Sequence, residues 1–282
     1  MPWKAKYQKH IWSQQDMIMN RAVQSMDVMM LAVLEKATDE FMQVGKITNF
    51  SEENFYLIIE RFYKEIVKSS YTSAEMAKQL QGVEPAKKKL ARIPNADSRL
   101  PKLVQFFSNK GEWPRMKKRG RRIVKSLRDY YFSKLDRKFK KIGPQLVNGE
   151  KSPDEVKKEL RKEWKTSKAR VETIFRTETT NYFNKVQREF FEKDKDIIGF
   201  LFQANRDSGT TDICRSRHGL VYRPNTELLR KNTPACHYRC RSEIIPLADI
   251  PENRKMLSDP SRDPAKRSVV PLPRGWVAGR KT

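Results

Sequence analysis

Apolar side chains recur every three or four residues over much of this chain, and this spacing constrains the fold more than any other feature. The longest such stripe lies within 14–44 and consists of Met19, Val23, Met26, Met30, Val33, Ala37 and Phe41. We therefore predict a long amphipathic helix that Gly45 terminates. Because methionine adapts to irregular partners, the stripe suits either the protein core or a docking face for another protein.

Further helices are predicted along the first half of the chain. One begins after Ser51 and fades near Tyr71, and a short helical piece spans 73–81. The proline-rich stretch 82–114 has few periodic apolar residues, so it is predicted to be a linker or an extended arm. A basic helix follows, and Pro114 suits a position in its first turn.

A chain break and a new helix start are predicted after the basic helix. Gly143, Pro144 and Gly149 are expected to interrupt the chain. Ser152 and Glu155 then have the types and spacing of a capping box, so a helix should begin there. Its buried side would be formed by Val156, Leu160 and Trp164. A separate helix is expected over 168–193.

Beyond 193 the pattern changes to short apolar runs typical of strands. They lie at 197–205, 219–224 and 241–247. The predicted fold class is therefore α+β, with a mostly helical N-terminal half followed by a small α+β domain that has a short, largely antiparallel sheet. The expected divisions are a helical protein-docking region 1–81, a linker 82–113, a basic helix 114–149, a small domain 150–250 and an extended basic tail 251–282.

The formal net charge of +25 favours a polyanionic partner: nucleic acid, an acidic protein surface or an anionic membrane. Residues 12–60 contain 3 Lys/Arg and 8 Asp/Glu, whereas residues 86–141 contain 20 Lys/Arg and 4 Asp/Glu. If the basic helix packs through its apolar stripe, its opposite face can bind phosphates without sequence preference. The predicted contacts are Arg115, Lys117, Lys118, Arg119, Arg121, Arg122, Lys125 and Arg128.

The apolar runs and the cysteine count of the sequence indicate the compartment and the redox state of the thiols. No stretch approaches the roughly 20 apolar residues of a membrane span, and the N-terminus has no apolar run of the signal-peptide type. The three cysteines cannot all pair within one chain. We therefore expect a protein made in the cytoplasm, with no membrane partner and no disulfide framework.

Three segments of the second half form an ordered set of motifs. The first is IFRTETTNYFN, the second RDSGTTDICRSRHGLVY and the third PACHYRCRSEIIPL. Together they resemble the C-terminal domain of the phage Mu F-like minor head proteins, the head morphogenesis proteins of tailed phages. The resemblance covers about 167–247. The residues that carry its motifs include Arg176, Thr177, Glu178, Thr210, Gly219 and Arg241.

This resemblance implies a minor structural protein of the virion, present in few copies in the head interior near the portal. It implies portal protein, major capsid or scaffold protein, and double-stranded DNA as partners, and a role in head assembly, genome packaging or delivery. Two alternatives stay open: a nucleic-acid-binding protein without a virion role, and a metal-dependent nuclease. The sequence shows no acidic two-metal cluster and no glycine-rich phosphate loop, so we expect no enzymatic activity.

Cysteine and histidine gather in the second and third motifs, which makes zinc a candidate cofactor. Zn²⁺ takes four ligands from Cys, His and carboxylates. Cys214, His237 and Cys240 are the first three candidates, and either His218 or Asp207 would be the fourth. Cys236 is a substitute thiol. Many relatives have a C-x-x-C pair in the second motif, and here only its second cysteine is present.

Two metal-free hypotheses compete with zinc. In the first, the thiols are buried as small apolar groups, and Arg241 pairs with Glu178 or Asp207 to lock the R-T-E helix to the sheet. In the second, Cys214 acts as a nucleophile with His237 as its base. The sequence leaves these alternatives open.

Overall fold

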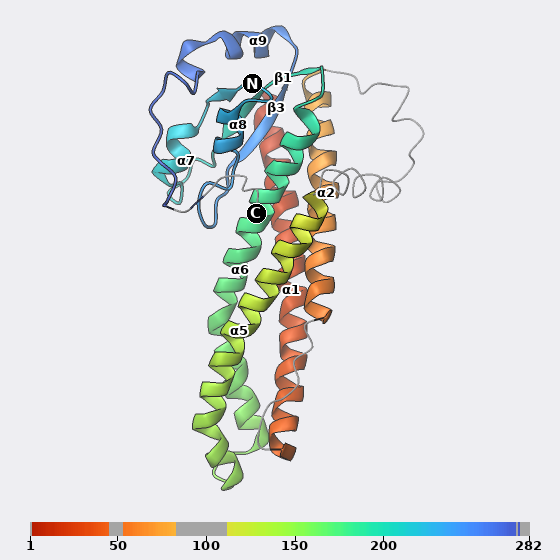
Figure 1. Cartoon of the computed structure of the whole chain (residues 1–282), viewed down its shortest axis with the longest axis vertical. Coiled ribbons are helices and arrows are strands. Elements are labelled where there is room, and N and C mark those ends of the chain that lie inside the picture. Colours follow the sequence, from red (N-terminus) through yellow and green to blue (C-terminus); the bar gives the residue numbers. More distant parts are fainter. Residues whose placement is uncertain (1, 45–52, 83–111, 275, 277–282) are drawn as a thin grey trace, which may run out of the picture.

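The computed structural model describes residues 2–44, 53–82, 112–274 and 276. Four long helices lie side by side in an elongated bundle, and a small α+β unit covers one end of it (Figure 1). The helices are α1 (Pro2–Val44), α2 (Glu53–Leu80), α5 (Glu112–Val147) and α6 (Pro153–Phe191). This architecture confirms the predicted α+β class. The predicted linker lies almost wholly outside the described residues.

The bundle is held by apolar side chains that all four helices contribute. α1 packs against α2 and α6, and α5 packs against the same two helices. Met19, Met26 and Met30 are buried in this core, so the methionine stripe of α1 is core rather than a docking face. Edge-to-face ring pairs join α2 to α6, with centroids 4.8 Å apart for Phe62–Phe175 and 5.0 Å for Tyr63–Tyr182.

The first two helices are longer than predicted, because buried residues continue the packed face of each beyond the predicted ends. α1 begins at Pro2, since Tyr7 and Ile11 extend its stripe and are fully buried. α2 continues unbroken past Tyr71, because the small polar residues Ser70 and Ser73 take over its buried face. The Ser70 hydroxyl donates to the Phe183 carbonyl of α6 at 2.6 Å.

The predictions for the next two helices were partly wrong. α5 does not end at Gly143, because Pro144 lies inside its last turn and the helix ends at Val147. The turn after it uses Gly149 at a positive φ of 72°. α6 is one helix rather than two, since Ser167 and Val171 continue its buried stripe.

The start of α6 confirms the predicted capping box. The Glu155 amide donates to the Ser152 hydroxyl, and the Ser152 amide donates to the Glu155 carboxylate at 2.8 Å. The two reciprocal bonds satisfy backbone donors that the first helical turn leaves unpaired.

Gly120 lets α5 approach α2 closely. A Cβ at this position would collide with Cγ2 of Ile59 and would lie 3.2 Å from a ring carbon of Tyr63. A glycine within the run of basic residues is therefore a packing requirement of the bundle.

The small unit is built on a three-stranded antiparallel sheet in the order β2-β1-β3. Its strands are β1 (Ile197–Gln203), β2 (Val221–Tyr222) and β3 (Glu243–Ala248), which confirms the three predicted strands. Phe200 pairs with Tyr222 on one side, and Leu201 pairs with Ile245 on the other. Short helices α7 (Asp212–Arg217) and α8 (Glu227–Asn232) lie in the connections.

The tail is more ordered than predicted. It forms α9 (Pro251–Ser258) and a 3-10 turn (Pro260–Arg262) before running back along the small unit. The Arg217 guanidinium donates to the Val270 carbonyl at 2.8 Å, and the Trp276 indole donates to the Ala235 carbonyl at 2.9 Å. Hydrogen bonds from and to the tail therefore hold a segment that has few apolar side chains to bury.

Gln81, at the end of α2, ties the bundle to the small unit. The side-chain oxygen Oε1 of Gln81 accepts from the Ala248 amide and the Asn253 side chain, and the side-chain NH₂ donates to the Pro246 carbonyl. The side chain is buried, so these bonds are shielded from water. One glutamine thus links α2 with β3 and α9.

One stretch, Trp3–Lys36 of α1, is long and apolar enough to cross a membrane by length and composition. This differs from the expectation that no stretch approaches that limit. The core helix of a soluble bundle passes the same test, and this stretch supplies the packed face of α1 described above. About 39% of its most apolar window is buried inside the structure, so the bundle core covers part of this apolar surface.

Candidate functional site

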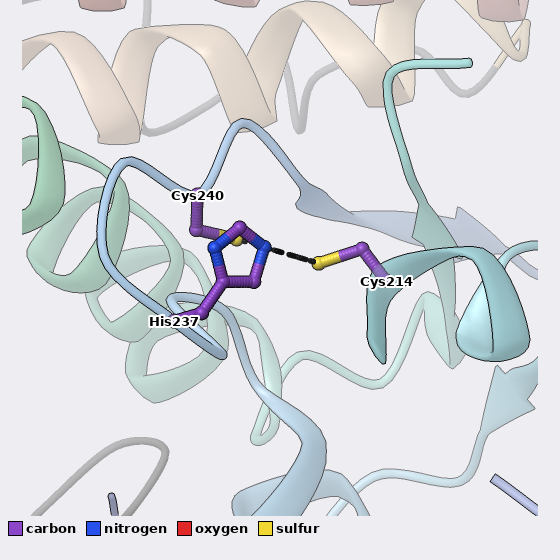
Figure 2. A group of neighbouring side chains, drawn as sticks. All are labelled: Cys214, His237 and Cys240. Atoms are coloured by element: carbon purple, nitrogen blue, oxygen red, sulfur yellow. Dashed lines mark hydrogen bonds between the residues drawn. The ribbon is translucent and has the colours of Figure 1, made fainter. Parts of the chain in front are cut away.

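Three metal-capable side chains converge beside the sheet, as the sequence predicted. Figure 2 shows Cys214 on α7 facing His237 and Cys240, which lie on the turn before β3. The Cys214 sulfur lies 3.1 Å from His237 Nε2 and 3.7 Å from the Cys240 sulfur. Their ligand atoms all lie within 4.8 Å of one another. Both thiols are buried and His237 is half-buried.

The surroundings of the two thiols favour the protonated form when no metal is bound. Hydrogen bonding with Cys236 and burial raise the pKa of Cys214 to about 11, although hydrogen bonding with Cys240 opposes the rise. Burial and the Cys214 thiol raise the pKa of Cys240 further. For His237, burial lowers the pKa, but hydrogen bonding and charge interaction with Cys240 outweigh it, so the net pKa is raised. These thiols lack the lowered pKa of an activated nucleophile.

The three residues could hold a zinc ion by ligand type, and the spacing of the two sulfurs suits tetrahedral coordination. Zinc–sulfur bonds of about 2.3 Å place two sulfur ligands about 3.8 Å apart, close to the separation of the two sulfurs here. His237 Nδ1 lies 2.7 Å from the Tyr238 carbonyl, so its N–H can donate there and leave Nε2 as the ligand atom. Three protein ligands would leave the fourth position to another group.

The other predicted ligands lie elsewhere. His218 accepts a hydrogen bond from the Ala204 amide at its Nδ1, 3.2 Å away. Both carboxylate oxygens of Asp207 are 2.6 Å from the guanidinium of Arg241. Cys236 is buried but is not among the three residues whose ligand atoms cluster. Among the described residues the group therefore has three members, and neither proposed fourth ligand joins it.

The R-T-E motif joins three parts of the molecule through three consecutive residues. Arg176 reaches Asp16 of α1 at 3.1 Å. The Thr177 hydroxyl accepts from the Arg239 amide at 3.0 Å, on the turn that carries the cysteine and histidine. Glu178, nearly fully buried, accepts from Arg119 of α5 at 2.8 Å. A polar motif in mid-helix is thus explained by connections to α1, the turn and α5.

Two further polar residues of α6 hold the backbone of the same region. Thr180 donates to the Cys240 carbonyl at 2.6 Å. Asn184 accepts from the Ile244 amide at 2.7 Å and donates to the Ser242 carbonyl at 3.2 Å. Both side chains are buried. Together with Thr177 they position the turn, and with it two of the three clustered side chains.

The predicted arginine lock takes a different form. Arg241 pairs with Asp207, one of its two predicted partners, and therefore joins two loops of the small unit. Glu178 is taken instead by Arg119, which the sequence had assigned to nucleic acid. The Thr210 hydroxyl accepts from the Asp207 amide at 3.1 Å and helps shape this loop. Gly219, the remaining motif residue, has a positive φ of 83°.

The basic face of α5 is largely where the sequence placed it. Met116, Ile123, Val124 and Leu127 are buried on one side of the helix. Exposed on the helix surface are Lys117, Lys118, Arg121, Arg122 and Lys125. Arg115, Arg119 and Arg128 are half-buried, and Arg128 binds Asp129 at 2.8 Å. Five of the eight predicted contacts are thus exposed, and Arg119 has a structural partner.

A cavity of about 690 Å³ lies between α5 and α6, next to this basic face. Its lining includes Arg119, Arg122 and Arg170, and the aromatic pair Tyr238 and Trp276. The Arg170 guanidinium lies 4.2 Å from the centroid of the Tyr130 ring, which holds it in place. Positive charge therefore continues from the surface of α5 into the groove beside it.

Sequence reasoning missed several residues that build this region. Thr180, Asn184 and Gln81 were not singled out, because isolated polar residues within a helix or just after it give no periodic signal. Arg119 was hidden within the basic run. Its spacing gave a clue: Arg119 follows Met116 by three residues and precedes Ile123 by four, so all three lie on the same face of the helix.

Comparison with protein families finds a match over residues 140–245 to the family described as Phage Mu protein F like protein. The match begins within α5 and ends in β3, so it contains the R-T-E motif, the three clustered ligands and Arg241. No curated protein and no solved structure matches the chain. The resemblance predicted from the motifs is confirmed over residues 140–245, a segment that is similar to the phage Mu F-like family and that links the chain to phage head-related proteins.

Proposed function

We propose that this protein is a minor component of the phage head interior that lies near the portal and binds double-stranded DNA without sequence preference through α5. The single observation that carries the DNA proposal is the exposed cationic face of that helix. Lys118, Arg121, Arg122 and Lys125 are exposed, and none has a carboxylate within ion-pair distance among the described residues. Unpaired surface cations are available for phosphates.

Binding of this kind releases counterions from DNA, so its affinity depends on salt. Four phosphate contacts give a slope of log affinity against log salt of about −3.6, at roughly 0.9 per contact. Replacing Lys118, Arg121, Arg122 and Lys125 with Gln should abolish most of the affinity and most of the slope. Arg119 is left unchanged, because its replacement would leave the buried Glu178 without its cation.

Fluorescence anisotropy with a labelled duplex, measured across a salt series, tests this proposal. The matched control replaces Lys158, Lys162, Lys165 and Lys193, which are also exposed, and removes the same charge. Equal loss of affinity in the two variants would show that only the net charge matters, and it would overturn the placement of DNA on α5. Two duplexes of unrelated sequence should bind with similar affinity.

The proposed protein partners are the portal, the major capsid protein or a scaffold, and α1 and α2 are the proposed contact region. A groove of about 600 Å³ lies between these helices, and its lining includes Ile18, Val28 and Leu57. Val28 and Leu57 are 71% and 61% exposed, which is unusual for large apolar side chains in a monomer's surface groove. We expect the protein to co-purify with portal rings. The double variant Val28→Ser, Leu57→Ser should lose this co-purification.

We further propose that Cys214, His237 and Cys240 bind a structural Zn²⁺. The supporting observation is the convergence of two buried thiols and an imidazole from separate segments, with a sulfur–sulfur spacing suited to tetrahedral coordination. Zinc would stabilise the connection between α7 and the turn before β3. The raised pKa values of the thiols favour this structural role over nucleophilic catalysis.

Metal analysis of purified protein should give about one zinc per chain. Cys214→Ser should reduce the zinc content and the melting temperature. Cys236→Ser changes a buried thiol that neighbours Cys214 but is not one of the three ligands, so this variant should retain the zinc. Protein that is folded but holds far less than one zinc per chain would contradict the proposal. In the same preparation, incubation with DNA and a divalent metal should leave the DNA uncut, in agreement with a structural role.

A further inference from the structure

The strongest unassigned feature is a polar pocket where α1, α6 and two loops of the small unit meet. Its volume is about 510 Å³. It is lined by Trp12, Gln15, Asp16, Arg176, Asn205, Gly209, Arg239 and Arg241. Among the described residues α5 contributes nothing to it, so it is separate from the proposed DNA face.

Three guanidinium groups line this pocket, and only two of them have a carboxylate partner. Arg176 pairs with Asp16 at 3.1 Å, and Arg241 pairs with Asp207. Arg239 is exposed and has no ion pair in the part of the chain that the structure describes. The pocket therefore carries an uncompensated positive charge beside two fixed ion pairs.

Two buried hydrogen-bond donors at the pocket also lack partners. The indole N–H of Trp12 and the side-chain NH₂ of Gln15 are inaccessible to water and make no hydrogen bond among the described residues. Leaving a buried donor unpaired is costly, and native proteins seldom do so without a reason. A small shift of either side chain would expose its donor to the pocket, where an anion with several acceptor oxygens would satisfy it.

Neighbouring side chains restrain Arg241 at its guanidinium and Arg239 at its backbone. Arg241 makes a two-pronged contact with Asp207, and Gly209 beside it has no side chain. A Cβ at Gly209 would lie 2.7 Å from Nη2 of Arg241, so a larger residue would displace the guanidinium. The amide of Arg239 is fixed by Thr177. The guanidinium of Arg241 and the backbone of Arg239 are thus preorganised, which favours binding of a rigid multivalent anion.

We propose that this pocket binds a phosphate group, carried either by a nucleotide or by the end of a nucleic acid strand. Phosphate has three or four oxygens and suits planar guanidinium donors. The volume is within the range that accommodates a small organic ligand as well as the phosphate itself. The charge, the unpaired donors and the fixed arginines all point to this ligand class.

Thermal stability and calorimetry of the full chain test the proposal with defined probes. The probes are inorganic phosphate, pyrophosphate, a nucleoside monophosphate, and a short duplex with or without a 5′-phosphate, all at constant ionic strength. At least one phosphate compound should raise the melting temperature relative to chloride. A response to the free phosphates identifies a small ligand, and a response only to the phosphorylated duplex identifies a strand end.

Arg239→Gln should weaken the binding about tenfold or more, since it removes a charged donor. Arg223→Gln is the matched control, because Arg223 is exposed and lies outside the pocket. Gln15→Leu should weaken binding as well, while the free protein stays equally stable or becomes more stable, because an unpaired donor is removed. No response to any phosphate compound, or equal binding by the Arg239 and Arg223 variants, would overturn the proposal.

Discussion

Asn184 offers a sharp test of how the α6 helix holds the small unit. Its side chain is fully buried and bonds the Ile244 amide and the Ser242 carbonyl. Asn184→Ala would leave both backbone groups without this partner in a space that water reaches poorly. Each orphaned buried group costs about 1–3 kcal/mol, so we expect a loss of about 3 kcal/mol in the free energy of unfolding.

Chemical denaturation followed by circular dichroism would measure this loss, and thermal melting would show a drop on the order of 10 °C. Asn181→Ala is the matched control, because Asn181 lies on the same helix, is half-buried and has no hydrogen bond from its side chain among the described residues. The control should change the free energy of unfolding by less than about 0.5 kcal/mol. If the two variants lose equal stability, the polar residues of α6 do not fasten the turn and β3 in the way described.

Three further predictions concern single residues. Burial raises the pKa of Glu243 well above its ordinary value, and its carboxylate has no hydrogen bond among the described residues. The folded protein then keeps a proton that the unfolded chain releases above about pH 4.5, so stability should fall as the pH rises from there toward the folded pKa. Glu243→Gln should remove this fall in stability, so the variant should be more stable than wild type at about pH 8 but not at about pH 4. Chemical denaturation at both pH values measures the difference. If the stabilities of the two proteins change with pH in parallel, the raised pKa of Glu243 is contradicted. Arg119→Gln should cost about 1–2 kcal/mol because it strands the buried Glu178, whereas Arg122→Gln should be nearly neutral in the same denaturation assay. Gly120→Val should lower the melting temperature sharply by separating α2 from α5, and an unchanged melting temperature would show that the helices adjust without cost.

The sequence predicted the helices where apolar side chains form the buried face and failed where small or polar residues do so. The three strands and the capping box at Ser152 were found because their signals are local. The continuity of α2 was missed because Ser70 and Ser73 are not apolar, although both are buried and Ser70 bonds to α6. Burial of small polar residues depends on the neighbouring helix, which a single-chain pattern does not reveal.

The candidate site shows the same division. The convergence of Cys214, His237 and Cys240 was predicted from residue type and motif order. The partners of the charged residues were harder to predict, because many arginines compete for few carboxylates in a chain of this charge. Arg119 was predicted to contact DNA but binds Glu178. Arg241 was predicted to pair with either Glu178 or Asp207 and pairs with Asp207. Such pairings depend on three-dimensional distances rather than on spacing along the chain.

Photo-cross-linking inside assembled phage heads would test the central proposal most directly. Ser126 is exposed on α5 beside Arg122 and Lys125, and the three native cysteines are buried, so Ser126→Cys can carry a cross-linker selectively. Irradiated heads should yield protein joined to the packaged DNA, whereas the same label at Thr166→Cys, exposed on α6, should yield much less. Absence of the protein from purified heads, or cross-links from Ser126→Cys to protein alone, would contradict the account.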